Sequence, residues 1–281
     1  MPEETFTVIL GDRRYAVRRK WARLPPGSAF GFISDLMVDR AGRVHVAQRG
    51  SDQPIVVFER DGSYAGAWGE GTIGEPHYVT RAADDTVLVA DRDCHQILRF
   101  DADGTLVQSL GRRHFPSLGA PFNHPTSAAV TDDGEIYVAD GYGNSNVHRF
   151  AADGSLLKTW GRPGRNPGQF TTPHAIWVDR FDKVLVADRE NNRVQVFDRE
   201  GRFIAAWGDF YHPMKIWIDD RDLVFVTDQI PRITLLSPDG DLVGRCRGAI
   251  NGAHGIGGDD EGNIFLAELP PQEITKLERL D

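Results

Sequence analysis

Three of the nine histidines stand at the same distance from an acidic residue that closes a short apolar run. An Asp or Glu follows fourteen residues after each of His77, His174 and His254. Three imidazoles that leave a fourth position open are the ligand set of a catalytic zinc ion. The alternative is that each histidine caps the start of a strand by a hydrogen bond to backbone. We favour metal ligation, by Zn²⁺ or another divalent transition metal.

The acidic residues belong to a repeat with spacings of 40 to 49 residues. The phrase VADRDCHQILRFDADG, ending at Gly104, returns in related form ending at Gly154 and at Gly201, and weaker copies bring the number of units to six. The Asp position of "VAD" is occupied in turn by Gln48, Asp91, Asp140, Asp188, Asp228 and Glu268. A period of this length is typical of propellers and other repeat folds.

Each unit contains alternating apolar and polar segments separated by short turns with Asp-Gly or Asn, which indicates consecutive antiparallel strands. Four such strands in a unit of this length form a propeller blade. The sequence therefore predicts an all-β protein, a six-bladed β-propeller with four-stranded antiparallel blades over residues 15–281, preceded by an N-terminal arm over residues 1–14. The last unit ends after its third strand, so we expect a strand within Tyr15–Leu24 to complete it and close the ring.

The repeat also explains why three distant histidines should meet. Fourteen residues before each "VAD" position, at the start of each innermost strand, stand Ser34, His77, Thr126, His174, Met214 and His254. Histidine occupies this slot in blades two, four and six, which are related by rotations of 120° about the axis. Side chains that project from these slots into the channel would converge with trigonal symmetry.

The residues just after the "VAD" position should surround the same mouth of the channel. They are Arg49, Arg92, Tyr142 (one place later), Arg189 and Gln229. Arginines there would bind a carboxylate through paired hydrogen bonds, and Tyr142 would transfer a proton, with its pKa lowered by a neighbouring cation. The alternative for each arginine is a structural salt bridge. We predict catalytic roles for Tyr142, Arg189 and Arg49, and substrate contacts for Arg92, Gln229 and Met214.

Composition narrows the classes of partner. The net charge of −9 disfavours nucleic acid and anionic membrane surfaces as partners. No apolar run is long enough to span a membrane, and the amino terminus lacks the order of a signal peptide, so we expect a cytoplasmic protein. Two cysteines, Cys94 and Cys246, are too few for a disulfide framework.

With these residues the chain resembles the NHL-repeat propellers and, among them, the peptidyl-α-hydroxyglycine α-amidating lyases. The resemblance is most specific in DGYGNS, in PGQF followed by TPH, and in ADREN, all within 121–197. It implies a zinc ion held by His77, His174 and His254, a catalytic tyrosine at Tyr142, and essential arginines at Arg189 and Arg49. In that family the lyase cleaves a carbinolamide carbon–nitrogen bond and releases an amide and glyoxylate.

The chain departs from the family pattern around its third histidine. The family motif there is MPHD, whereas this sequence reads Gly252, Ala253, His254, Gly255. Loss of the Met removes an active-site wall, and loss of the Asp removes a ligand of the calcium ion found at the centre of the family's propeller, so calcium is doubtful here. The cysteine of the family's DGYCNS is Gly143, which removes a disulfide.

Three functions are compatible with these observations. The first is a zinc-dependent lyase acting on a carbinolamide or a related hydroxylated small molecule that carries a carboxylate. The second is a hydrolase or hydratase that activates water at the same histidines. The third is a non-enzymatic NHL propeller that binds a protein or nucleic-acid partner. The sequence leaves the oligomeric state open.

Overall fold

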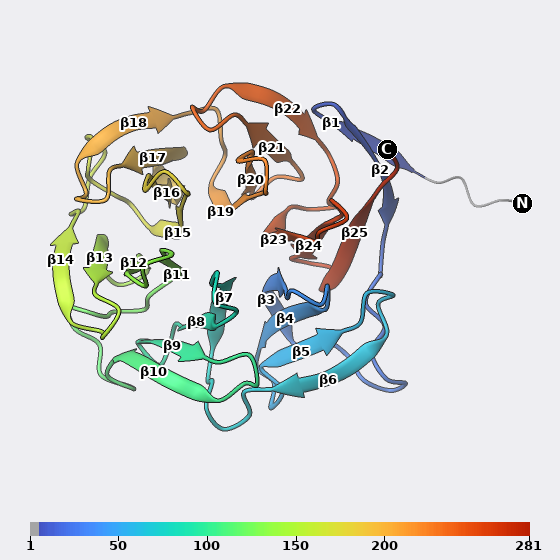
Figure 1. The fold of residues 1–281 in the computed structure, drawn as a ribbon, viewed down its shortest axis with the longest axis horizontal. Helices are drawn as coiled ribbons and strands as arrows, with labels where there is room; N and C mark the ends of the chain where they lie inside the picture. Colours follow the sequence, from blue (N-terminus) through green and yellow to red (C-terminus); the bar gives the residue numbers. More distant parts are fainter. Residues whose placement is uncertain (1–5) are drawn as a thin grey trace, which may run out of the picture.

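The protein is a ring of six antiparallel sheets around a central axis, as Figure 1 shows. This is a computed structural model, and it describes residues 6–281. The predicted six-bladed propeller is confirmed.

Blades one to three are formed by consecutive strands, from the channel outwards. Blade one contains β3 (Phe32–Val38), β4 (Val44–Arg49), β5 (Ile55–Phe58) and β6 (Tyr64–Trp68). Blade two contains β7 (Pro76–Arg81), β8 (Val87–Asp91), β9 (Gln96–Phe100) and β10 (Leu106–Gly111). Blade three contains β11 (Ser127–Val130), β12 (Ile136–Asp140), β13 (Asn146–Phe150) and β14 (Leu156–Trp160).

Blades four and five repeat this arrangement, and blade six is completed by the amino-terminal strands. Blade four contains β15 (Pro173–Val178), β16 (Val184–Asp188), β17 (Arg193–Phe197) and β18 (Phe203–Trp207), with a short 3₁₀ turn η1 (Arg189–Asn191). Blade five contains β19 (Pro213–Ile218), β20 (Val224–Asp228), β21 (Ile233–Leu236) and β22 (Leu242–Cys246). Blade six contains β23 (Ala253–Gly258), β24 (Ile264–Glu268), β25 (Glu273–Arg279), β2 (Arg13–Arg18) and β1 (Thr7–Leu10), in that order.

Burial falls from the inner strands to the outer ones. Every residue of β8 and β16, both with the sequence VLVAD, is buried, whereas β14 (LLKTW) has no buried residue. Among residues 6–281 the apolar core is divided into six clusters, and each lies between two neighbouring blades. Because every blade packs against two others, burial of apolar surface holds the inner strands in fixed positions around the channel.

Ring closure occurs largely as predicted, with two corrections. The strand that completes blade six is Arg13–Arg18, which is shorter than the predicted segment Tyr15–Leu24, and it pairs with β25 through Val17 and Leu277. The predicted arm over residues 1–14 contains a strand of its own, because Thr7–Leu10 pairs with β2 as a fifth strand. Residues 1–5 of that arm lie outside the described residues.

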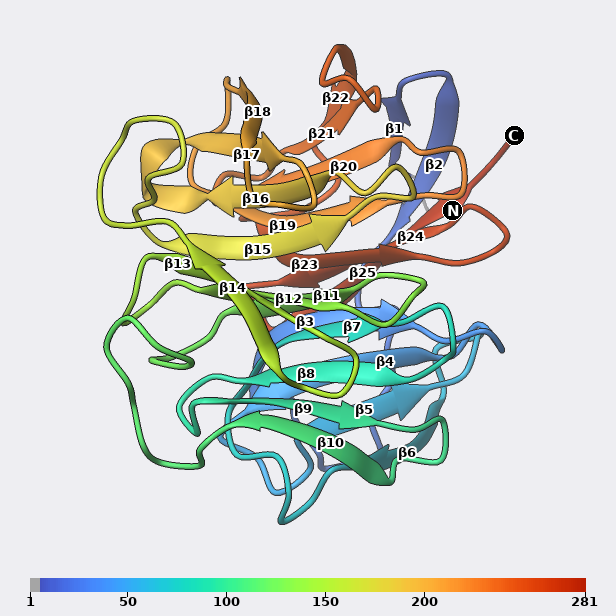
Figure 2. The ribbon, with the colours of Figure 1, turned by 60° about the vertical axis from the view of Figure 1, so that its left-hand side comes forward.

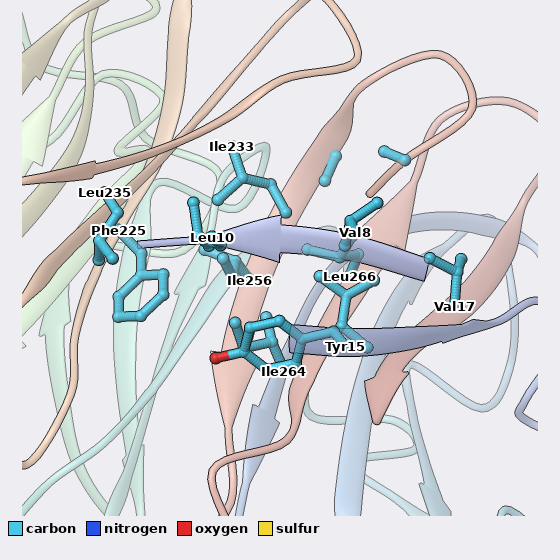
Figure 3. Close-up of a cluster of buried hydrophobic side chains, with 13 residues drawn as sticks. Val8, Leu10, Tyr15, Val17, Phe225, Ile233, Leu235, Ile256, Ile264 and Leu266 are labelled. Carbon is cyan, nitrogen blue, oxygen red and sulfur yellow. The ribbon is translucent and has the colours of Figure 1, made fainter. Parts of the chain in front are cut away.

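The reason for this extra strand is an apolar cluster that its alternate residues enter. Figure 3 shows Val8 and Leu10 of β1 among Ile233 and Leu235 of blade five and Ile256 of blade six. Leu10 is buried, whereas its neighbour Ile9 is 64% exposed, which is the alternation expected of a strand with one face covered. The β1 strand thus joins the fifth and sixth blades.

Two long connections, residues 112–126 and 161–172, project from the side of the ring on which the innermost strand β15 begins, on the left of Figure 2. None of the helices among residues 6–281 is long and apolar enough to cross a membrane.

Candidate metal centre

The three histidines predicted as ligands meet in the channel. They are the second residues of β7, β15 and β23, the innermost strands of blades two, four and six. Their ring centroids form a nearly equilateral triangle, with separations of 4.9 Å for His77 and His174, 5.0 Å for His77 and His254, and 5.1 Å for His174 and His254. One nitrogen from each imidazole lies within 4.8 Å of the others, and all three residues are buried.

The repeated spacing of fourteen residues has a local cause. In each blade the residue before the histidine pairs across the sheet with the acidic anchor, as Pro76 does with Asp91 and Pro173 with Asp188. The anchor carboxylate also accepts hydrogen bonds from the loop that leads into the inner strand, for example from the Glu75 N–H at 2.7 Å. The anchor therefore fixes where the inner strand begins.

Each histidine is oriented by the next blade around the ring. The Nδ1 atoms of His77, His174 and His254 donate to the backbone carbonyls of Thr126 (2.7 Å), Met214 (2.9 Å) and Ser34 (2.5 Å), respectively. These acceptors occupy the equivalent slots of blades three, five and one. Because a carbonyl only accepts, each neutral ring is protonated at Nδ1 and keeps a lone pair on Nε2. The backbone bond that was the alternative to metal ligation is therefore also what prepares Nε2 to bind a metal.

The three rings are neutral at ordinary pH. Burial lowers the pKa of His254 to about 3 and holds the pKa of His77 and of His174 well below the usual value for histidine. The other histidines and nearby arginines act in the same direction. Since a metal binds the unprotonated imidazole, burial keeps these rings in the form that can coordinate.

The Tyr142 hydroxyl lies above the three histidines. Its oxygen is 2.9 Å from His174 Nε2, 3.1 Å from His77 Nε2 and 3.4 Å from Arg189 Nη1. The loop that follows β12 carries this side chain over the channel, and the residue as a whole is 41% exposed. The phenol therefore points its oxygen at the place where Nε2 lone pairs converge.

The three predicted arginines have different surroundings. The Arg92 guanidinium pairs with Asp93 at 2.6 Å and lies 5.5 Å from the centroid of the Tyr142 ring. Arg189 begins η1 and forms an ion pair with Glu190 at 3.0 Å, while its Nη1 reaches the tyrosine. Both arginines therefore form ion pairs, but with the acid that follows them in the chain and not with the preceding Asp or an acid of a neighbouring blade, which was the structural alternative.

Arg49 forms no ion pair with any residue in 6–281. Its Nε is buried without a hydrogen-bond partner among those residues, and its guanidinium carbon is 4.1 Å from the centroid of the Phe32 ring. Burial and the charge of Arg92 lower its pKa. A buried guanidinium that has no ion-pair partner among residues 6–281 favours an incoming anion.

The two remaining predicted residues are placed differently from the histidine ligands. Met214 is buried, and its carbonyl accepts hydrogen bonds from His174 and Tyr78. Gln229 is exposed, and its backbone N–H is 3.2 Å from the carbonyls of Tyr211 and His212. The hydrogen bonds found within 6–281 do not link the Gln229 side chain to the histidines.

A second layer of side chains, which the sequence did not predict, lies directly beneath the histidines. Tyr78, which follows His77, donates its hydroxyl to the carbonyls of Met214 and His254. Asp35 and Lys215, which follow the slot residues Ser34 and Met214, form a buried ion pair. The available signal was one charged residue inside each of two apolar inner strands, FISDLMV and PMKIWI.

The residues present fit a zinc ion. Three oriented Nε2 atoms and an open side toward Tyr142 are the donor set of a zinc site that keeps one position free for substrate or water. Imidazole nitrogens do not suit calcium, which takes oxygen ligands.

The fold and this arrangement define the class of protein, a six-bladed β-propeller with three histidines in its channel. The NHL repeat family matches residues 122–150 and 170–197. Among known proteins, human NHL repeat-containing protein 3 is 34% identical over 184 residues, which is 60% of this chain and 53% of that protein. A probable peptidyl-α-hydroxyglycine α-amidating lyase of Caenorhabditis elegans is 34% identical over 152 residues, which is 52% of this chain and 43% of that protein.

These matches confirm the predicted resemblance to NHL-repeat propellers and amidating lyases. The chain spans about half the length of the first of these relatives. Among solved structures, a gluconolactonase from Xanthomonas campestris superposes with a TM-score of 0.74 at 15% identity, over 96% of this chain and 91% of that one. A streptogramin B lyase gives 0.68 at 11% identity, over 95% of this chain and 98% of that one, and both show the shared fold.

Proposed function

We propose that this protein is a metal-dependent lyase that cleaves a carbinolamide or a related hydroxylated small molecule. The observation that carries the proposal is the Tyr142 hydroxyl within 3.1 Å of the Nε2 atoms of two buried, neutral histidines. This contact supports a role for Tyr142 in moving a proton at the open side of a three-histidine site. Similarity to the amidating lyases supports the same chemistry.

A zinc ion held by His77, His174 and His254 would supply Lewis acidity toward the hydroxyl of the substrate. Tyr142 has the position to take the proton of that hydroxyl and to return it to the leaving nitrogen. As the proton leaves, the O–H electron pair forms a carbonyl double bond. The carbon–nitrogen bond breaks with its electron pair going to nitrogen, which then receives the proton from Tyr142, so that the products are a carbonyl compound and an amide.

Arg49 and Arg189 would hold the carboxylate of the substrate. Arg49 offers a guanidinium without an acidic partner among residues 6–281, and Arg189 reaches the tyrosine oxygen. A carboxylate bound between them would bring the adjacent hydroxyl-bearing carbon toward the histidines. Arg92 is paired with Asp93 and would contribute to the charge at the mouth rather than bind the carboxylate directly.

Metal content tests the proposal directly. We expect about one zinc, or another divalent transition metal, per chain in the purified protein, and loss of this metal in His174→Ala. The matched control is His114→Ala, because His114 is an exposed histidine outside the slots. A protein that binds no transition metal, or a His174→Ala variant that keeps it, would contradict the proposal.

The same site would also suit a hydrolase or hydratase, because both chemistries need an open metal position and a nearby proton acceptor. The product formed from an N-acyl-α-hydroxyglycine in ¹⁸O-labelled water separates the two. A lyase derives the oxygen of the new carbonyl from the substrate hydroxyl, whereas hydrolysis incorporates solvent oxygen. Any exchange of the product carbonyl with water is measured in parallel on the authentic product.

A non-enzymatic role remains the second candidate, favoured by similarity to NHL repeat-containing protein 3. In that case the variants His77→Ala, His174→Ala and His254→Ala would keep partner binding, and no turnover of a carbinolamide would be measured in the parent protein.

A further inference from the structure

A fully buried ion pair lies in the channel, next to the histidines in sequence and in space. Lys215 of β19 and Asp35 of β3 come from the innermost strands of blades five and one, and the Lys215 ammonium contacts Asp35 Oδ2. Both side chains are at most 4% exposed. Their sequence neighbours Met214 and Ser34 supply two of the carbonyls that orient the histidines.

Groups from blade two complete the surroundings of the ammonium. Lys215 Nζ donates to the Val79 carbonyl at 3.2 Å and lies 4.3 Å from the centroid of the Tyr78 ring. On the other partner, Asp35 Oδ2 accepts the Val79 N–H at 2.9 Å. A carboxylate, a carbonyl and an aromatic face are together a full set of partners for a desolvated ammonium.

The same place does not suit a calcium ion. Calcium takes six to eight oxygen ligands, typically with several carboxylates, whereas Asp35 and the Val79 carbonyl are the acceptors that contact the Lys215 ammonium among residues 6–281. The position after His254 is Gly255, where an added Cβ would lie 2.3 Å from Asp35 Oδ1. Any side chain there, an acidic one included, would displace the ion pair.

We propose that the Lys215 ammonium is the resident axial cation of this propeller, held by Asp35, and that it closes the channel beneath the histidines in place of a metal ion. A cavity of about 220 Å³ on the far side of Lys215 is lined by Trp177, Trp217 and Lys215 itself. The ion pair separates this cavity from the histidines, so the candidate site opens on one face of the ring. This inference goes beyond the proposed function and does not depend on zinc.

The first test uses the unmodified protein and calcium alone. After dialysis against calcium chloride and removal of free ion, we expect no stoichiometric calcium by elemental analysis. The melting temperature should be the same in calcium and in EGTA. One bound calcium per chain together with a higher melting temperature in calcium would overturn the proposal.

The second test is a double-mutant cycle in urea with Lys215→Met, Asp35→Asn and both together. Lys215→Met leaves a buried carboxylate without its cation and should lower the urea midpoint strongly. The double variant should recover part of that loss, because neither new side chain carries a charge. The control Lys183→Met breaks an ion pair with the exposed Asp239 and should change the midpoint little.

A double variant destabilised by the full sum of the two single effects would show that the two charges are not coupled and would also overturn the proposal. If Lys215→Met does not fold at all, two measurements still test the proposal. One compares the urea midpoint of Asp35→Asn with that of the double variant, and the other is the calcium measurement on the parent protein.

Discussion

The hydroxyl of Tyr142 contacts two imidazole Nε2 atoms and an arginine, so three polar groups define its position in the site. We expect Tyr142→Phe to lower kcat by about 10² to 10⁴-fold, the usual range for loss of a group that transfers a proton. Metal content should not change, because none of the three histidines is removed.

Tyr211→Phe is the matched control, since Tyr211 is half exposed and its ring makes an edge-to-face contact with His212 rather than with the three channel histidines. The measurement is turnover of an N-acyl-α-hydroxyglycine together with elemental analysis of both variants. Equal kcat values for the two variants would remove Tyr142 from the mechanism.

The buried histidines also predict how the stability of the metal-free protein depends on pH. An unfolded histidine titrates near pH 6.5, whereas His254 in the folded protein titrates near 3. The unfolded state therefore binds more protons between these values, and stability falls as the pH is lowered through 6.5. At pH 5.5 this single group should cost about 1.4 kcal/mol relative to high pH.

His254→Gln removes this contribution, so its unfolding free energy should fall less than that of the parent protein between pH 7.5 and 5.5. Burial raises the pKa of Asp35 and of Asp228 to about 6. These two acids change the stability in the direction opposite to that of His254. Their contribution favours folding below their unfolded pKa and is lost as the pH rises through 6. Both acids remain in the variant, so their effects largely cancel in the comparison. Parallel curves from urea unfolding would contradict the assignment of a neutral, buried His254.

At the scale of elements, β1 is the strand whose contribution is easiest to separate from the rest of the ring. Leu10→Ala should destabilise the protein by about 2 to 5 kcal/mol, because its side chain is buried between blades five and six. Ile9→Ala, one residue away on the exposed face, should change the unfolding free energy by less than about 0.5 kcal/mol. Urea unfolding measures both, and equal effects would show that β1 does not pack as described.

The inner strands divide two tasks between alternate blades. Blades two, four and six supply the imidazoles, and blades three, five and one supply the carbonyls of Thr126, Met214 and Ser34 that orient them. The Thr126 hydroxyl also donates to the carbonyl of Pro173, the residue before His174. The Ser34 hydroxyl likewise donates to the carbonyl of Pro76, the residue before His77. The geometry of each ligand therefore depends on the blades beside it.

For the whole molecule, the net charge is −9, and the basic side chains at the mouth of the channel form only a small cluster. Arg49, Arg92 and Arg189 lie around Tyr142, and two of them are paired with Asp93 and Glu190. We expect no measurable binding of single-stranded RNA or duplex DNA at physiological ionic strength, because a phosphate backbone needs an extended basic face. Fluorescence anisotropy with labelled oligonucleotides checks this, and saturable binding would favour the nucleic-acid alternative.

The amino-acid sequence by itself determined the architecture and the ligand slots. Six copies of one pattern predict six blades, because strand alternation and Asp-Gly turns act between neighbouring residues. The offset of fourteen residues predicts the convergence of His77, His174 and His254, because the acidic anchor and the histidine belong to one hairpin. Closure of the ring by an amino-terminal strand was predictable from the missing strand of the last repeat.

Only the tertiary structure decided which side chains from different blades meet. Lys215 and Asp35 are 180 residues apart and pair because the innermost strands of blades five and one both border the channel. The structure likewise shows Arg92 paired with Asp93 and Arg49 without an acidic partner in 6–281, although both occupy the same repeat position. The β1 strand pairs because Val8 and Leu10 pack into the apolar cluster between blades five and six. A repeat determines where each residue stands in its own blade, whereas its partners depend on how the closed ring brings the other blades around it.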